Sequence, residues 1–258
     1  MSLVLVTKHV IYILEELKNN KIKWCLYMIN YSIGITTYSY RYEKFLINLI
    51  SEIKKNKDNE IILAINGNYN ENFDEVYKKN VLELSSKYND IFPFVYPNFR
   101  SLAKMWNNIV INSTNEYVLL LNDDISITDP IFWKLVEENI EKHQTSFGIN
   151  SSFCAFIIKK SELYEMGWFD ERFLGIGWED NNFYDRYQKQ FNRAYLYLTN
   201  ISGINIHVDI ENRIINQRKS ISGYEKYSEF NRKIYEQKLE SIQQYPYEKF
   251  YWDNYSKL

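Results

Sequence analysis

The sequence predicts an α/β fold with a mixed, mainly parallel central sheet, and three observations lead to this prediction. From Tyr31 onward, short apolar runs rich in β-branched residues alternate with longer segments whose apolar residues recur at helical spacing. At 258 residues, the chain can bury a sizeable core without disulfides or metals. Its 45% hydrophobic residues, 8 glycines and 4 prolines are typical of a globular protein and exclude a disordered or fibrous one.

The first half of the chain contains four predicted strands joined by three predicted helices. The strands are expected at residues 31–36, 60–65, 92–96 and 117–121. The helices are expected at residues 42–53, 73–84 and 102–110, where apolar side chains form one stripe. Right-handed crossovers between parallel strands bring their carboxyl ends to one edge of the sheet, where ligands of such folds bind.

The second half of the chain has a different pattern. We expect helices at 131–143 and 161–166, strands at 152–158, 195–198 and 203–208, and a charged, Tyr-rich helix at 224–243. After the predicted helix at 161–166, residues 167–177 are expected to form a loop rich in glycines and aromatic residues. A helix should follow this loop, with Asp180 as its N-cap. Because no Gly/Ser linker separates the halves, we expect a single domain over residues 31–210, preceded by an extension (1–30) and followed by a helical, aromatic tail (211–258).

The charge and hydropathy of the sequence argue against nucleic acid as a partner and against insertion into a membrane. With 31 Lys and Arg against 33 Asp and Glu, the chain lacks the basic field that holds nucleic acid. The apolar N-terminal residues are interrupted by Lys8 and His9, which predicts neither a membrane span nor a signal peptide. We therefore expect a cytoplasmic protein with at most peripheral membrane association.

Polar residues follow each of the four predicted strands at the edge where a ligand should bind. They are Thr36 and Thr37, then Asn66, then Arg100 and Lys104, and finally Asn122, Asp123 and Asp124. The carboxylates after the fourth strand are the hard oxygen ligands that Mg²⁺ or Mn²⁺ prefers when it bridges a diphosphate. An Asp pair at an arbitrary position would more often be a turn or a helix cap, but this position favours a metal site.

A second acidic pair, Glu179 and Asp180, follows Gly177 and Trp178. Carboxylates at the start of a helix are favoured by its dipole, so capping alone could explain Asp180. Two glycines among bulky rings, however, are typical of a loop that a ligand approaches closely, and aromatic faces edged by carboxylates suit sugars. His207 ends a late predicted strand, where a lone histidine is more often structural than a ligand.

These segments resemble the inverting family 2 glycosyltransferases. Residues 31–41, including Arg41, resemble the first strand and loop of that family, residues 61–67 its second strand, and 119–124 its Asp-x-Asp segment, with Asn122 in place of the first Asp. Residues 166–180, ending in Gly177-Trp178-Glu179-Asp180, are similar to the acceptor segment that the family shares with β-1,4-galactosyltransferases. The resemblance covers about residues 31–210.

The resemblance implies a GT-A fold, with a donor half up to about residue 150 and an acceptor half after it. It implies that Asp124 binds Mn²⁺ or Mg²⁺ with His207, that Asp180 is the catalytic base, and that Glu179 binds the acceptor beside Gly177 and Trp178. Donor binding falls to the remaining edge residues: Thr36, Thr37, Arg41, Asn66, Arg100, Lys104, Asn122 and Asp123.

The implied function is transfer of a sugar from a nucleotide-sugar donor, with a UDP-sugar favoured, to a saccharide or lipid-linked saccharide. The Asn-, Ile-, Lys- and Tyr-rich composition resembles that of AT-rich bacteria, where such enzymes build capsule or lipooligosaccharide. Three alternatives stay open: a sugar-nucleotide pyrophosphorylase, a glycoside hydrolase and a non-catalytic carbohydrate-binding protein. The glycine-free segment 36–40 disfavours the first, which needs a Gly-rich loop to hold a nucleoside triphosphate.

Overall fold

The computed structural model of the protein describes residues 30–38, 41–67, 74–199, 201–206 and 224–244, with the side chains of the last helix described from 227 to 240. The chain clusters into two compact units, Met1–Asn30 and Tyr31–Leu258. All described helices and strands belong to the second unit. They confirm the predicted α/β class.

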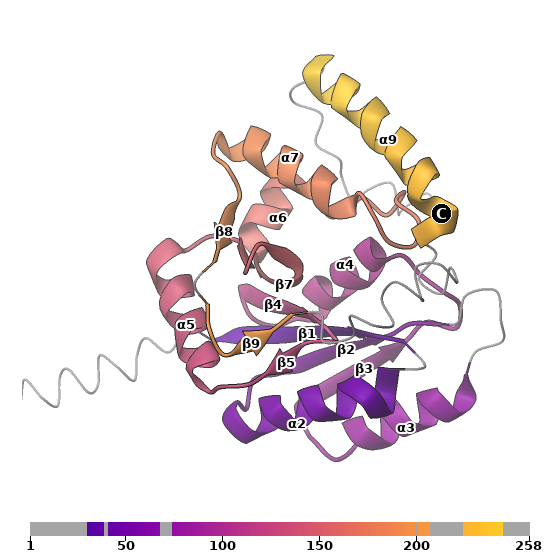
Figure 1. Ribbon diagram of the computed structural model, residues 1–258, viewed down its shortest axis with the longest axis vertical. Helices are drawn as coiled ribbons and strands as arrows, with labels where there is room; N and C mark the ends of the chain where they lie inside the picture. Colours follow the sequence, from indigo (N-terminus) through magenta and orange to yellow (C-terminus); the bar gives the residue numbers. More distant parts are fainter. Residues whose placement is uncertain (1–29, 39–40, 68–73, 200, 207–223, 245–258) are drawn as a thin grey trace, which may run out of the picture. The chain divides into compact units, whose positions relative to one another are not determined.

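A seven-stranded sheet forms the centre of this unit, in the order β3-β2-β1-β4-β7-β6-β8 (Figure 1). Four neighbouring strands are parallel: β1 (Tyr31–Thr37), β2 (Ile61–Ile65), β3 (Ile91–Val95) and β4 (Tyr117–Asn122). Next to β4, β7 (Ser152–Lys159) runs antiparallel and pairs with β6 (Phe147–Ile149), which is parallel to β8 (Leu196–Leu198). A separate two-stranded ladder joins β5 (Ser126–Ile127) to β9 (Ile204–Asn205).

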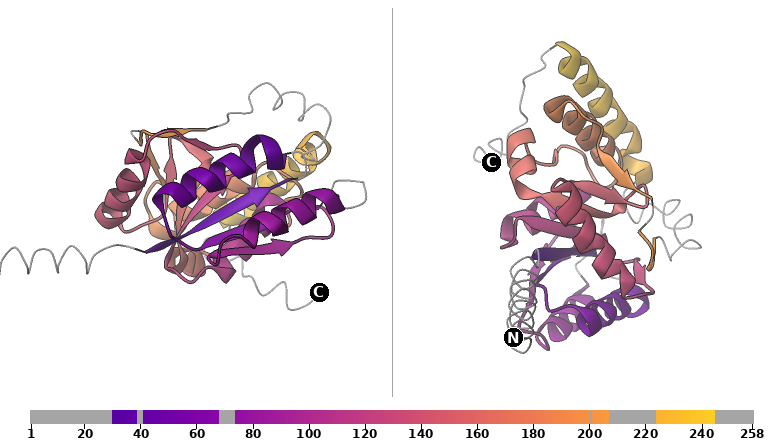
Figure 2. Two further views of the ribbon diagram at one scale, coloured as in Figure 1. Left: turned by 90° about the horizontal axis from the view of Figure 1, so that it is seen from below. Right: turned by 90° about the vertical axis from the view of Figure 1, so that its left-hand side faces the viewer.

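Helices cover both faces of the parallel strands. A π-helical turn, η2 (Tyr42–Leu46), continues into α2 (Ile47–Asn56), which lies with α3 (Glu75–Ser85) on one face, whereas α4 (Leu102–Asn112) lies on the other (Figures 1 and 2). The remaining helices are α5 (Ile131–His143), α6 (Lys160–Met166), α7 (Glu179–Phe191) and α9 (Tyr224–Gln244). Among the described residues, no helix is both long and apolar enough to cross a bilayer.

Coverage by helices on both faces explains why the inner strands are buried along their length. Every residue of β1 and β2 is buried, as expected for parallel strands between two helical layers. Gly34 in β1 lets α4 approach closely, because a Cβ there would collide with the side chain of Ile109.

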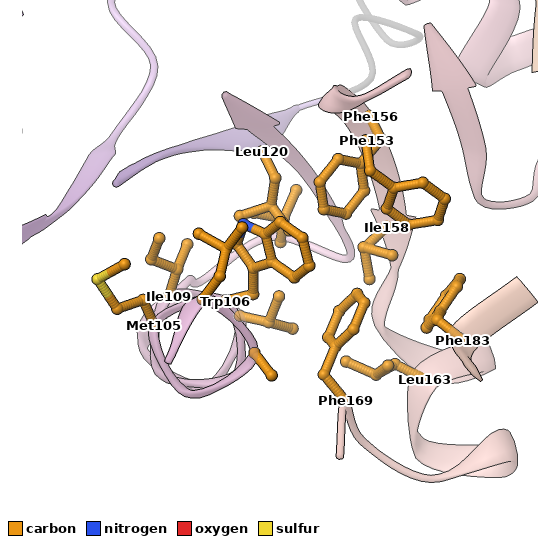
Figure 3. Packing of buried hydrophobic residues seen from close by; sticks show 14 of the residues in the cluster. Met105, Trp106, Ile109, Leu120, Phe153, Phe156, Ile158, Leu163, Phe169 and Phe183 are labelled. Atoms are coloured by element: carbon orange, nitrogen blue, oxygen red, sulfur yellow. The ribbon is translucent and has the colours of Figure 1, made fainter. Parts of the chain in front are cut away.

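One aromatic core joins the two halves of the chain (Figure 3). Trp106 on α4 contacts Phe156 on β7 and Phe169 in the α6–α7 loop, at ring-centroid distances of 5.1 and 5.0 Å. Phe169 in turn stacks on Phe183 of α7 at 4.6 Å, and Phe183 contacts Phe153 of β7 at 5.7 Å. Buried aromatic pairs of this kind stabilise beyond their area, so α4, β7 and α7 are held in one packed unit.

The predicted elements are confirmed, apart from the short ones and some boundaries. The strands β5 and β6 have only two and three residues, too few to show a period. The predicted strand at 203–208 is described only at Ile204–Asn205. In α5 the N-cap is Pro130, although the Asp129 carboxylate still accepts a hydrogen bond from the Ile131 amide at 2.8 Å.

Candidate functional site

The first acidic cluster follows β4 and is tied to the loop after β1. Asp123 has no exposed surface; its Oδ1 lies 2.7 Å from Nη1 of Arg41, and its Oδ2 accepts a 3.4 Å hydrogen bond from the amide of Tyr38. The same Arg41 nitrogen lies 3.2 Å from Oδ1 of Asp124. Burial raises the pKa of Asp123, and the charge of Arg41 opposes that rise. Arg41, predicted to bind the donor, therefore pairs with both carboxylates.

Two oxygen atoms of this cluster are buried and accept no hydrogen bond from any described residue. They are Oδ1 of Asn122 and Oδ1 of Asp124. The Asn122 oxygen has no hydrogen-bond partner among the described residues, and the Asp124 oxygen is paired with Arg41 by charge without hydrogen-bond geometry. Buried oxygens with so few donors are uncommon and suit a divalent cation that coordinates through oxygen. The cluster therefore fits Mg²⁺ or Mn²⁺. The described residues contain no group of three or more His, Cys, Asp or Glu side chains able to hold a metal by themselves, and His207 lies outside the described residues.

The residues predicted after β1 and β2 lie at the same edge. Thr36 is paired with Asn122 in the β1–β4 register, and both Thr36 and Thr37 are buried. Asn66 is also buried, and its side chain both donates to the carbonyl of Arg100 (3.0 Å) and accepts from the Arg100 amide (2.8 Å). This pairing makes Asn66 a positioning residue for the loop after β3.

Lys104, also predicted to bind the donor, lies on the first turn of α4. Its Nζ is 3.2 Å from Oε2 of Glu171 in the α6–α7 loop, and the Oε1 atom of Glu171 accepts a 2.9 Å hydrogen bond from Asn107. Lys104 thus forms an ion pair with a residue of the second half of the chain.

The second acidic pair begins α7. Glu179 is buried and its Oε2 accepts a 2.5 Å hydrogen bond from the amide of Gly177, whereas Asp180 is partly exposed and accepts from the Asn181 amide at 2.9 Å. Burial, followed by the charge of Asp180, raises the pKa of Glu179 to about 8. Burial also raises the pKa of Asp180. Of the two carboxyls, Asp180 is the one that can meet a solvent-borne hydroxyl.

The predicted N-cap role of Asp180 is wrong. The helix begins at Glu179, two residues earlier than that role requires, and its N-cap is Trp178 in the left-handed region at φ 73°. The preceding backbone explains this, because Gly175 and Gly177 also have positive φ values, of 62° and 115°, and turn the chain into the helix early. Asp180 therefore lies in the first turn, where the helix dipole favours a carboxylate.

The segments that carry the two acidic pairs both meet the start of β7. Leu121, just before the first cluster, is paired with Ala155 of β7, so β7 begins beside the carboxyl end of β4. Phe153, near the start of β7, contacts Phe183, one helical turn after Asp180. From α4, the amide of Leu102 donates a 3.0 Å hydrogen bond to Gly175, which ties the α6–α7 loop to this helix.

Two asparagines with a part in this arrangement were missed in the sequence. Asn107 on α4 donates to the carbonyl of Phe169 at 2.8 Å and accepts from its amide at 3.0 Å. Asn231 on α9 makes a similar pair with Leu174. In the sequence, each could have been noticed as an asparagine on the inward side of a predicted helix. The residue that such an asparagine bonds, however, is decided by the tertiary fold.

No protein-family model matches this sequence, and no curated protein matches it. Solved structures do match. They include TarS of S. aureus (TM-score 0.53, 16% identity, 73% of this chain and 38% of that chain) and the Pyrobaculum calidifontis mannosyltransferase PcManGT in complex with GDP-Man and Mn²⁺ (0.53, 11%, 67% and 55%). GalNAc-T7 with UDP, GalNAc and Mn²⁺ also matches (0.54, 11%, 67% and 43%).

The chain spans less than two thirds of the length of each of these proteins. At such low identity the likeness shows the fold alone. It confirms that the chain has the Rossmann-like GT-A architecture expected from the sequence.

Proposed function

We propose, from the GT-A fold and the two acidic pairs, that the protein is a metal-dependent inverting glycosyltransferase. It would move a sugar from a nucleotide-sugar donor, with UDP-sugars favoured, to a saccharide hydroxyl. One observation supports this proposal: the end of β4, which precedes Asp123 and Asp124, and helix α7, which begins with Glu179 and Asp180, both meet the start of β7. Similar proteins crystallised with UDP or GDP-Man support the donor class.

The first acidic cluster would hold the donor diphosphate through a divalent cation. Asp124 would be the principal ligand, because its buried Oδ1, which lies 3.2 Å from Nη1 of Arg41, accepts no hydrogen bond from the described residues. His207 would complete the site. In support, the β5–β9 ladder pairs Ser126, two residues after Asp124, with Asn205, two residues before His207. When bound, the cation supplies compensation for the negative charge of the leaving diphosphate.

The second acidic pair would receive the acceptor. The Asp180 carboxylate takes the proton of the acceptor hydroxyl while that oxygen bonds to the anomeric carbon. The bond from that carbon to the diphosphate oxygen breaks, and the nucleoside diphosphate leaves. Because the acceptor oxygen attacks on the side opposite the departing diphosphate, the configuration at the anomeric carbon is inverted. Glu179, buried and with a raised pKa, would hold the acceptor and orient the turn at Gly177 rather than accept the proton.

The acceptor would be a saccharide or lipid-linked saccharide of a bacterial surface polymer, with the protein at the cytoplasmic face of the membrane. This assignment extends the family resemblance by analogy.

Release of nucleoside diphosphate by the purified protein tests the proposal. A panel of nucleotide sugars is incubated with Mn²⁺ and with methyl glycosides of common hexoses, and diphosphate and coupled product are quantified. Asp180→Asn should lower turnover by about 10²- to 10⁴-fold, the usual contribution of a positioned base, without weakening UDP binding in calorimetry. Asp129→Asn, at an exposed position before α5, is the matched control. Turnover by Asp180→Asn equal to that of wild type would overturn the assignment of Asp180 as the base. If the wild-type protein consumed no donor, the proposed transferase activity would be overturned.

A further inference from the structure

The loop that leads to the second acidic pair has an unusual backbone. Residues 167–178, here called the α6–α7 loop, contain four positions with positive φ: Gly167, Gly175, Gly177 and Trp178. The tryptophan, at 73°, is in a region that bulky side chains rarely adopt. Such a conformation persists only when surrounding structure holds it, so the contacts that hold this loop also decide where Glu179 begins α7.

Helix α4 holds one side of the loop. The Asn107 carboxamide bonds both backbone groups of Phe169, and the Leu102 amide bonds the carbonyl of Gly175. These contacts fix the beginning and the middle of the loop, but none of them reaches Gly177 or Trp178.

Helix α9 holds the other side, and it reaches the end of the loop. The Oδ1 atom of Asn231 accepts from the amide of Leu174 at 2.9 Å, and its Nδ2 donates to the carbonyls of Leu174 (2.7 Å) and Gly177 (3.0 Å). Asn231 has no exposed surface. Both of its amide protons and one oxygen lone pair are therefore used on this loop.

The two backbone groups of Gly177 connect Asn231 to the second acidic pair. The Gly177 carbonyl accepts from Asn231, and the Gly177 amide donates to Oε2 of Glu179 at 2.5 Å. A shift of Gly177 would move Glu179, and with it the adjacent Asp180, because Glu179 and Asp180 form the first turn of α7.

Two more residues on the same face of α9 continue the contact, at the i+4 and i+7 positions from Asn231. Tyr235 lies 5.1 Å from the ring of Trp178 and donates a hydrogen bond to Asp185, and Lys238 pairs with Asp170. Figures 1 and 2 show α9 running beside α7.

This face of α9 is attached by polar groups. Among residues 227–240 of α9, the buried side chains are Asn231 and Lys238, and neither is apolar. Hydrogen bonds require defined distances and angles, unlike apolar burial. The attachment therefore fixes the position of the loop in addition to stabilising it.

We propose that Asn231 is a positioning residue for the acceptor site, which makes α9 a working part of the transferase. The inference rests on the proposed function. Asn231 holds the carbonyl of Gly177, the amide of Gly177 holds Glu179, and the acceptor hydroxyl is thereby presented to Asp180. The donor cluster after β4 makes no described contact with α9, so donor binding does not depend on Asn231.

Kinetics with separate donor and acceptor readouts tests this role. Asn231→Ala should raise the acceptor KM about tenfold and lower kcat, because small misplacements of reacting groups are costly, while UDP affinity with Mn²⁺ stays within twofold. Asn231→Asp keeps the oxygen that accepts from Leu174 but loses both donors, and should be impaired to a similar degree. Arg232→Ala is the matched control, since that exposed neighbour pairs only within α9, with Glu236 among the described residues.

Lost stability alone would lower the amount of active protein without changing KM, so an unchanged acceptor KM in Asn231→Ala overturns the inference and leaves the proposed function standing. A wild type that transfers nothing overturns the proposed function instead. Hydrogen exchange tests whether Asn231 holds the loop, and it does not require an active enzyme. Asn231→Ala should speed exchange of the backbone amides of residues 174–181 and leave exchange in α2 unchanged. Unchanged exchange at residues 174–181 would overturn the positioning role.

Discussion

Nη1 of Arg41 lies 2.7 Å from Oδ1 of Asp123, a carboxylate without exposed surface. This ion pair joins the loop after β1 to the end of β4, two segments 82 residues apart in the sequence. It also means that the guanidinium of Arg41 compensates part of the charge of Asp123 and Asp124 within the protein.

Arg41→Ala should destabilise the fold by about 3 kcal/mol, because removal of one partner leaves a buried carboxylate uncompensated. Urea unfolding in buffer without divalent cations measures the change. Arg232→Ala, which removes an exposed pair on α9, should cost no more than about 0.5 kcal/mol. The double variant Arg41→Ala/Asp123→Asn should recover part of the loss. Equal costs for Arg41→Ala and Arg232→Ala would show that the buried pair does not stabilise this edge.

Asp124→Ala should remove the contribution of Mn²⁺ to UDP binding, since it deletes the proposed principal ligand. Calorimetry with and without Mn²⁺ should show a metal-dependent gain in UDP affinity for wild type. We expect this gain to fall by roughly 100-fold or to vanish in the variant. Asp129→Ala, which removes an exposed carboxylate at the start of α5, should keep it. An identical gain in Asp124→Ala and wild type would exclude Asp124 as a ligand.

Glu179 should make stability fall as the pH rises. The pKa of this carboxyl is raised from 4.5 to about 8 in the folded protein, so between these values the folded state retains a proton that the unfolded state has released. The associated loss of stability is at most about 1.4 kcal/mol per pH unit. It is absent below pH 4.5 and complete above about pH 8.

Glu179→Gln is neutral at every pH and should lose this part of the pH dependence. Its free energy of unfolding relative to wild type should therefore rise from pH 5 to pH 8 in urea titrations. Glu138→Gln, at an exposed position on α5, should show no such trend. A wild-type-to-variant difference that is constant with pH would contradict the raised pKa.

Phe183→Ala should cost about 3–5 kcal/mol, the usual range for a fully buried phenylalanine. The ring stacks on Phe169 at 4.6 Å and joins α7 to β7. Phe92→Ala provides the comparison, because that ring is half exposed on the edge strand β3, and it should cost less than about 1 kcal/mol. Similar losses for the two variants in thermal or urea unfolding would argue against the aromatic core as the link between the halves.

Local patterns were enough to predict most of the elements and the sheet edge. Continuous apolar runs such as Ile61–Ile65 reflect burial on both faces of a strand, and the stripe in α4 reflects burial on one face of a helix. The position of polar residues after strand ends then placed Asn122, Asp123 and Asp124 at the carboxyl edge of the parallel strands without knowledge of any long-range contact. These features depend on residues a few positions apart, so the sequence displays them directly.

Tertiary structure alone decided how those side chains are used. Arg41 forms an ion pair with Asp123, and Asn66 hydrogen-bonds the backbone of Arg100. Asn231, which lies on α9, hydrogen-bonds the backbone of Leu174, 57 residues earlier in the chain. The start of α7 at Glu179 likewise follows from positive φ values in the loop before it. A hydrogen bond requires the donor–acceptor distance to be correct within a few tenths of an ångström. Between segments remote in sequence, only the packing of the whole chain sets such distances.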